Sequence, residues 1–99
     1  MIIEYIRYAL SEHSPAELIA AYNKAIRYLD AARECSEYEL SQCIEEPSIF
    51  VLRIKWISQQ AHLVGFRKGE NFPPFLEEIR GFIPEIVEMR HYHIQTFAN

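Results

Sequence analysis

The chain has 99 residues, of which 49% are hydrophobic and 24% charged, with only three glycines and five prolines. This is the composition of one folded globular domain, and it excludes a disordered chain. Ten basic residues stand against fourteen acidic ones and form no stripe along the sequence, so we expect no nucleic-acid partner.

The first predicted element is a strand over residues 2–10, because I-I-E-Y-I-R-Y-A-L is rich in β-branched and aromatic residues and is too short for an independent helix. The N-terminus also lacks the basic start and long apolar run of a signal peptide, and no segment reaches the ~18 apolar residues of a membrane span. We therefore expect a cytoplasmic protein that does not contact a membrane.

A helix is predicted from Ser14 to about residue 32. Ser14 can cap it, Pro15 suits the first helical position, and Glu17 stands where a capping box needs a carboxylate. Apolar residues then recur at intervals of three and four from Leu18 onward, as expected for a helix that packs one stripe against a core.

Two strands follow, over residues 35–44 and 49–57, and the short connection between them predicts a hairpin. The first strand alternates polar and apolar residues, which is typical of a half-buried strand. Cys35 and Cys43 are expected on this one strand, where a rise of ~3.3 Å per residue holds them beyond disulfide reach, so we expect two free thiols.

The second of these strands has one wholly apolar face, which carries Phe50, Leu52, Ile54 and Trp56. Its other face is mixed and carries Ile49, Val51, Arg53 and Lys55. We therefore expect this strand at the centre of its sheet, with something covering part of each face.

Two helices and a strand complete the predicted set. Ser58 is the N-cap of a helix that ends near Gly69, and a second helix begins at Asn71 and carries an apolar stripe as far as Ile83. The last strand spans roughly residues 85–95.

The predicted order β-α-β-β-α-α-β is that of an α+β, ferredoxin-like domain, a split β-α-β with a four-stranded antiparallel sheet and helices on one face. A single domain occupies residues 1–99. Because the face without helices carries Ile49 and Val51 among charged residues, we expect a homodimer that forms through this open sheet face.

The stretch W-I-S-Q-Q-A-H-L-V-G-F-R-K-G-E-N-F, residues 56–72, resembles the antibiotic biosynthesis monooxygenase family of small dimeric α+β barrels. Length and element order fit that family over essentially the whole chain. The family commonly carries H-x-x-[ST]-x-H-F in this region. Here the four defined positions hold Phe66, Gly69, Asn71 and Phe72, so both family histidines are replaced.

The resemblance implies a pocket between the sheet and the helices and, in catalytic members, oxidation of phenolic or quinol-type aromatics by O₂ without metal or flavin. The protein then has to supply an apolar slot, a base or hydrogen-bond partner for the phenol, and exclusion of water. Five aromatic residues are predicted to wall such a slot, and the alternative for all five is plain core packing: Trp56, Phe50, Phe66, Phe72 and Phe75.

His62 is the candidate base, because on a helix it lies one turn before Phe66 and on nearly the same face. The alternative is a partly exposed histidine without a partner. Tyr5 and Arg7 share one face of the first strand, and Arg90 approaches them if the first and last strands pair, so these three are candidates to orient a phenolate. The alternative for the arginines is an ion pair with a carboxylate such as Glu4, Glu39 or Glu88.

His91 and His93 stand two residues apart, so an extended strand places both on the face opposite Arg90 and Tyr92. A catalytic zinc site needs three protein ligands, and non-haem iron needs two histidines and a carboxylate. Glu37, Glu39 or His62 could supply the third ligand, but no spacing points from them to the histidine pair. We expect no metal and no other cofactor, and we interpret the pair as a pH-sensitive contact.

Two functions of different class remain open. The first is a cofactor-independent monooxygenase that acts on a small aromatic ligand, and the alternative is a non-catalytic homodimeric module that binds a small apolar ligand. Replacement of the family histidines favours the module, whereas Trp56 and His62 favour the enzyme, which we rank first. Haem degradation is disfavoured, because the strand-one asparagine of haem-degrading relatives has no counterpart in residues 2–10.

Overall fold

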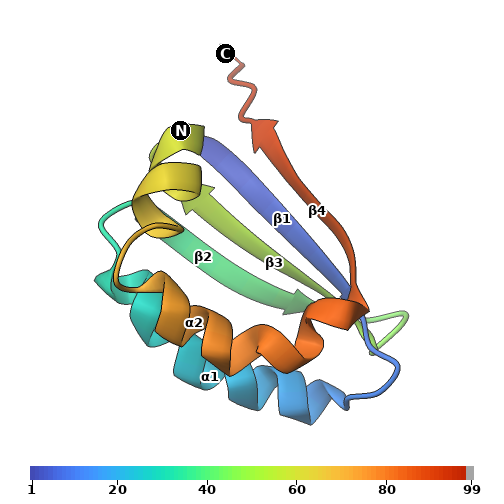
Figure 1. Cartoon of the computed structure of the whole chain (residues 1–99). Helices are drawn as coiled ribbons and strands as arrows, with labels where there is room; N and C mark the ends of the chain where they lie inside the picture. Colours follow the sequence, from blue (N-terminus) through green and yellow to red (C-terminus); the bar gives the residue numbers. More distant parts are fainter. Residues whose placement is uncertain (98–99) are drawn as a thin grey trace.

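The computed structural model describes residues 1–97 and has the predicted α+β, ferredoxin-like architecture. Its elements are, in order, β1 (Ile2–Ala9), α1 (Pro15–Ala31), β2 (Cys35–Gln42), β3 (Ile49–Trp56), η1 (Ala61–Phe66), α2 (Phe72–Ile79), η2 (Arg80–Glu85) and β4 (Ile86–His93). The strands form one antiparallel sheet in the order β2-β3-β1-β4, with β3 and β1 at its centre as predicted for β3. Helices α1 and α2 cover one face of the sheet (Figure 1).

The core lies between this sheet and the two helices. On β1 the side chains of even number point toward the helices, and in register Ile6 lies between Leu52 of β3 and Met89 of β4. The apolar face predicted for β3 is buried in full: Phe50, Leu52, Ile54 and Trp56. The helix-side face of β1 is also buried, and it is apolar except at one position. That position is Glu4, a carboxylate that is only 2% exposed.

The segment after β3 was predicted to be an ordinary helix, and the structure makes it a π-helix instead. Ser58 caps it as predicted, since its Oγ accepts the Ala61 N–H at 2.9 Å. The wider winding brings residues five apart together, and the Arg67 N–H donates to the carbonyl oxygen of His62 at 3.1 Å. Gly69 suits the turn that follows, because a Cβ at this position would lie 2.7 Å from the carbonyl oxygen of Gly65.

The predicted second helix is also divided. Regular α-helix ends at Ile79, and a 3₁₀ segment that contains Pro84 continues to Glu85. The change from 3.6 to about three residues per turn shifts the buried stripe, so Phe82 is buried while Ile83 is 43% exposed.

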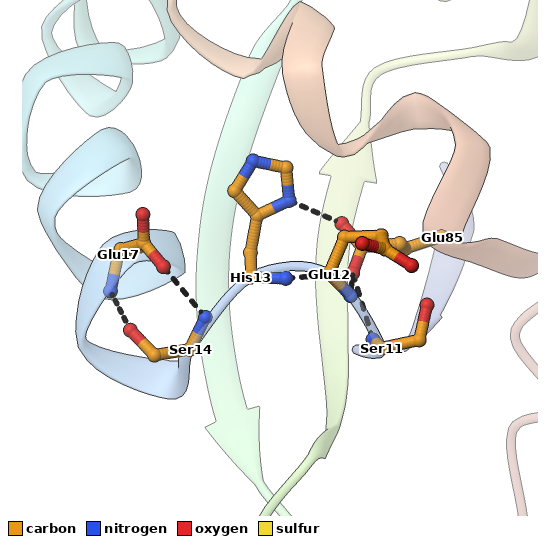
Figure 2. A network of polar contacts seen from close by, with 6 residues as sticks. All are labelled: Ser11, Glu12, His13, Ser14, Glu17 and Glu85. Carbon is orange, nitrogen blue, oxygen red and sulfur yellow. Dashed lines mark hydrogen bonds and ion pairs between the residues drawn. The ribbon is translucent and has the colours of Figure 1, made fainter.

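The turn between β1 and α1 is held to the start of β4 by a network of polar contacts (Figure 2). One carboxylate oxygen of Glu85 accepts the backbone N–H groups of Ser11, Glu12 and His13 at 2.8, 2.8 and 3.1 Å, and the other lies 2.6 Å from the His13 ring. The capping box predicted for α1 is formed next to it by Ser14 and Glu17. These contacts fix where α1 begins relative to β4.

Within residues 1–97, none of the helices is both long enough and apolar enough to cross a membrane. Both cysteines are free thiols, with Cys35 opening β2 and Cys43 just past its end.

Candidate active site

A cavity of about 230 Å³ lies between the helix-side face of the sheet and the segments η1, α2 and η2. Its wall is mostly apolar, and two half-exposed residues of that wall, Ile83 and Met89, place the mouth beside β4 and η2. Sites for drug-sized ligands have volumes of ~300–1,000 Å³. This cavity is smaller, so it suits a one- or two-ring aromatic ligand.

Four of the five predicted aromatic residues line this cavity together with His62. Phe66 stands at their centre, with ring centroids 4.9 Å from Trp56, 5.7 Å from Phe72 and 5.6 Å from Phe75. Phe66 and its neighbours therefore build a continuous aromatic wall at the position where the resembling family carries a histidine. The fifth residue, Phe50, is buried on β3 and lines a different hollow beneath α1.

Three other residues assigned to this pocket from the sequence lie outside it. Tyr5 and Arg7 have odd numbers on β1 and therefore project from the open face, away from the helices, and Arg90 is the register partner of Tyr5 on that same face. Tyr5 packs there edge-on against Tyr92, with ring centroids 5.3 Å apart. The prediction that these three orient a bound phenolate needs correction, because side-chain alternation puts the sheet between them and the cavity.

The polar end of the cavity is built around Trp56. Its indole Nε1–H donates to Oε1 of Glu4 at 3.0 Å, and its ring stacks on the imidazole of His62 with a centroid distance of 4.4 Å and an interplanar angle of 10°. Burial raises the pKa of the Glu4 carboxyl, and the hydrogen bond from Trp56 and the charge of Arg67 act against that shift. Trp56 thus orients both a buried carboxyl group and a buried imidazole.

His62 is 3% exposed, which excludes the alternative of a partly exposed histidine without a partner. Its Nδ1 lies 2.8 Å from Nε2 of His91, and its Nε2 lies 3.5 Å from Oε1 of Glu4. Burial, together with the positive charge of Arg67, lowers the pKa of His62 to about 3. At neutral pH the imidazole is therefore uncharged and has a lone pair to accept a proton.

Among residues 1–97, Glu4, His62 and His91 form the group whose ligand-type atoms come within 4.8 Å of one another. That spacing suits a metal centre or a series of polar contacts. His62 turns Nδ1 to His91 and Nε2 to Glu4, so its two ring nitrogens face different partners. We therefore describe them as a chain. Glu37 and Glu39, considered as third ligands from the sequence, lie on β2, at the opposite edge of the sheet from β4.

Two further polar groups reach the cavity. Arg67 contributes to its lining directly after η1, and its positive charge acts on Glu4, His62 and His91. The hydroxyl groups of the buried residues Tyr8 and Tyr22, which also line the cavity, lie 2.5 Å apart. Burial raises the pKa of Tyr8 to about 12 and that of Tyr22 well above its usual range, so both remain neutral phenols.

Sequence reasoning missed Glu4 and Arg67 as site residues, and only Glu4 left a signal. Glu4 has the same parity as Ile2, Ile6 and Tyr8, and a lone carboxylate on the apolar face of a strand is a reason to look for a buried site. Arg67 follows His62 by five residues, which gives proximity only in a π-helix, a form without a reliable sequence pattern.

Comparison with proteins of known structure agrees with this fold. A protein of Bordetella bronchiseptica, provisionally assigned to the antibiotic biosynthesis monooxygenases, is 21% identical, with 96% of this chain and 97% of that one covered and a TM-score of 0.79. A variant of SnoaB, a cofactor-independent oxygenase from Streptomyces nogalater, is 12% identical, with 97% and 94% covered and a TM-score of 0.79. A conserved protein from Methanosarcina mazei is 15% identical, with 95% and 92% covered and a TM-score of 0.76.

No curated protein matches the chain by sequence. The family model for antibiotic biosynthesis monooxygenase does match it, over residues 1–78, a span that contains β1, the aromatic wall and His62. The chain belongs to the antibiotic biosynthesis monooxygenase family.

Proposed function

We propose that this protein is a cofactor-independent monooxygenase that oxidises a small phenolic or quinol-type aromatic with O₂. One observation carries the proposal: an apolar aromatic cavity with a buried, neutral imidazole, His62, at its polar end. A phenol seated against the aromatic wall can give its proton to His62, and Arg67 can hold the resulting phenolate. The description of SnoaB as a cofactor-independent oxygenase supports this reaction class.

The reaction needs no group that the substrate and oxygen do not provide. A phenolate is electron-rich and reduces O₂ one electron at a time, and recombination of the two radicals forms a peroxide at the ring carbon para to the oxygen. Transfer of the para hydrogen, cleavage of the O–O bond and protonation of the oxygen that leaves give a quinone and water. For 1-naphthol the balance is C₁₀H₈O + O₂ → C₁₀H₆O₂ + H₂O, in which the substrate loses four electrons and O₂ gains them.

The chain's own residues have three tasks in this sequence. His62 accepts the phenolic proton, the apolar wall excludes water from the radical pair, and Arg67 offsets the negative charge of the phenolate and then of the peroxide. The Tyr8 and Tyr22 pair offers a neutral hydrogen-bond partner at the far end of the ligand.

The test compares His62→Gln with wild type in oxygen uptake over a panel of naphthols and quinols. Glutamine cannot take up the proton, so kcat/KM should fall by ~10²-fold, the usual scale of general base catalysis. His93→Gln is the matched control, since His93 is exposed at the end of β4 and outside the cavity, and it should keep the wild-type rate.

Thermal unfolding of the three proteins separates a lost base from a lost fold. Similar midpoints together with a loss of rate limited to His62→Gln would support the proposal. No oxygen uptake by wild type across the panel, or equal rates for His62→Gln and wild type, would reject it and leave the non-catalytic ligand-binding module as the function.

A further inference from the structure

The proposed reaction requires a place for the substrate proton that His62 itself does not offer. The imidazole is 3% exposed and stacked on Trp56, and the positive charge of Arg67 acts on it. A charged imidazolium in this position is opposed by burial and by like charge. The proton must therefore leave His62 almost as soon as it arrives.

The contact between His62 and His91 provides a route. At 2.8 Å, Nδ1 of His62 and Nε2 of His91 are within hydrogen-bond distance, so one of these nitrogens donates and the other accepts. His91 lies on β4 at the sheet edge and is half-buried, whereas His62 is fully buried. The pair thus connects the cavity to the surface of the protein.

The direction of this hydrogen bond follows from Glu4. Oε1 of Glu4 already accepts the indole N–H of Trp56 at 3.0 Å, and Nε2 of His62 lies 3.5 Å away, beyond a good hydrogen bond. Nε2 therefore has no acceptor that would hold a proton on it. The tautomer that satisfies the geometry carries the proton on Nδ1, donates it to His91 and leaves the Nε2 lone pair for a ligand in the cavity.

We propose that His91 stores the substrate proton during turnover, receiving it through His62 and returning it to the oxygen atom that leaves as water. This inference rests on the proposed function. As the phenol O–H bond breaks, Nε2 of His62 gains that proton while Nδ1 passes its own to Nε2 of His91. His62 remains neutral throughout and the charge lies on His91. When the para hydrogen has been transferred and the O–O bond has broken, hydroxide is released in the cavity; the reverse transfer gives it the stored proton to form water, and both histidines regain their starting tautomers.

The difference in burial between the two imidazoles, rather than the charged groups that face them, favours this direction of transfer. Glu4 on β1 and Arg67 after η1 lie against His62, and Arg67 also acts on His91. Burial and the charge of Arg67 lower the pKa of both imidazoles, but His91 is the less buried of the two and its charged form can be solvated at the sheet edge.

The first experiment needs neither turnover nor a known substrate. Nitrogen-15 NMR of histidine-labelled protein distinguishes protonated from unprotonated ring nitrogens. In the resting protein at neutral pH we expect His62 to be protonated on Nδ1 and unprotonated on Nε2. A proton on Nε2, directed at Glu4, would overturn the proposal whether or not the protein is an enzyme.

The second experiment follows the proton itself with 4-nitrophenol, whose anion is coloured. At a pH at which the free phenol is neutral, the bound phenol should appear as the anion and the ring of His91 as imidazolium. In His91→Gln the bound phenol should stay neutral, while His93→Gln should behave as wild type. Equal ionisation in His91→Gln and wild type would show that His91 does not hold the proton.

Kinetics then distinguish proton storage from a merely structural role. In His91→Gln we expect kcat to fall by about tenfold with KM unchanged, and the acid limb of the kcat profile to move to lower pH, because only His62 is left to titrate. If kcat falls but the acid limb of its pH profile stays at the same pH, His91 has only a packing role. If wild type shows no turnover, the proposed function fails, and the NMR and nitrophenol results still decide the role of His91.

Discussion

Trp56 is the residue on which the candidate site depends most. It is fully buried, its indole N–H donates to Glu4, its ring stacks on His62, and Phe66 packs against it. The same side chain therefore belongs to the core and orients the two titratable groups of the cavity. The sequence offered two interpretations of Trp56, a core residue and a residue of the pocket wall. The structure places it in both.

Trp56→Ala should consequently affect the fold more than any other change in the cavity. Loss of so large a buried ring, with the void it leaves, should lower the free energy of unfolding by ~3–5 kcal/mol. Urea denaturation measures this loss, and Phe97→Ala is the control, because Phe97 is an aromatic residue with 83% exposure. A cost below ~1 kcal/mol for Trp56→Ala would contradict the packing described here.

At the level of elements, periodicity and capping signals predicted the four strands, helix α1 and the approximate position of the helical segments between β3 and β4. Alternation identified the faces of β3, and Ser14 with Glu17 marked the start of α1, because these signals depend on neighbours in sequence. The π-helical winding of η1 and the 3₁₀ winding of η2 could not be read in this way, since they arise from packing against the sheet. The same reason explains why no spacing in the sequence connects Glu4 or His91 to His62, although His62 was considered as a third ligand beside His91 and His93: the three residues come from three separate elements.

The contact of Glu85 with the turn before α1 predicts a dependence of stability on pH. Burial alone raises the pKa of the Glu85 carboxyl, but hydrogen bonds from Ser11, His13 and Glu12 outweigh it and lower that pKa to about 2. A carboxyl pKa lowered in the folded state stabilises the protein above the unfolded value of 4.5, and this stability is lost as the pH falls toward 2.

Glu85→Gln should therefore unfold more easily than wild type at pH 7, by about 1–3 kcal/mol, because the charge-assisted hydrogen bonds become neutral ones. The difference should shrink as the pH falls from 4.5 toward 2, where the wild-type carboxyl is protonated too. Denaturation curves at several pH values measure it, with Glu12→Gln as an exposed control. A difference that is independent of pH would mean that the charge of Glu85 does not hold the turn.

At the scale of the whole molecule, the main question is what covers the open face of the sheet, since no helix of the described chain lies on it (Figure 1). Half-buried Tyr5 and Val51 lie there beside Arg7, Arg53 and Lys55, on the side without helices. Exposed faces with apolar residues of this extent usually meet a partner. We expect a homodimer that pairs two copies of this face.

Val51→Lys should convert that dimer to a folded monomer. The new lysine lies beside Arg7 and Arg53, and in a symmetric dimer the positive charges of the two copies would face and repel each other. Sedimentation equilibrium at micromolar concentration measures the change. Ile19→Lys, on exposed helix surface, should remain dimeric. A wild-type monomer at this concentration would be incompatible with pairing through the open face.

In the function proposed above, the cavity beside His62 is where oxygen enters a phenol without a metal. The most direct measurement supplies ¹⁸O₂ and 1-naphthol to protein that has been treated with chelator and checked by elemental analysis for the absence of zinc, iron and copper. We expect one ¹⁸O atom in the naphthoquinone formed, one in water, and one O₂ consumed per product. Unlabelled product with stoichiometric hydrogen peroxide, or activity that returns only when a metal is added back, would contradict it.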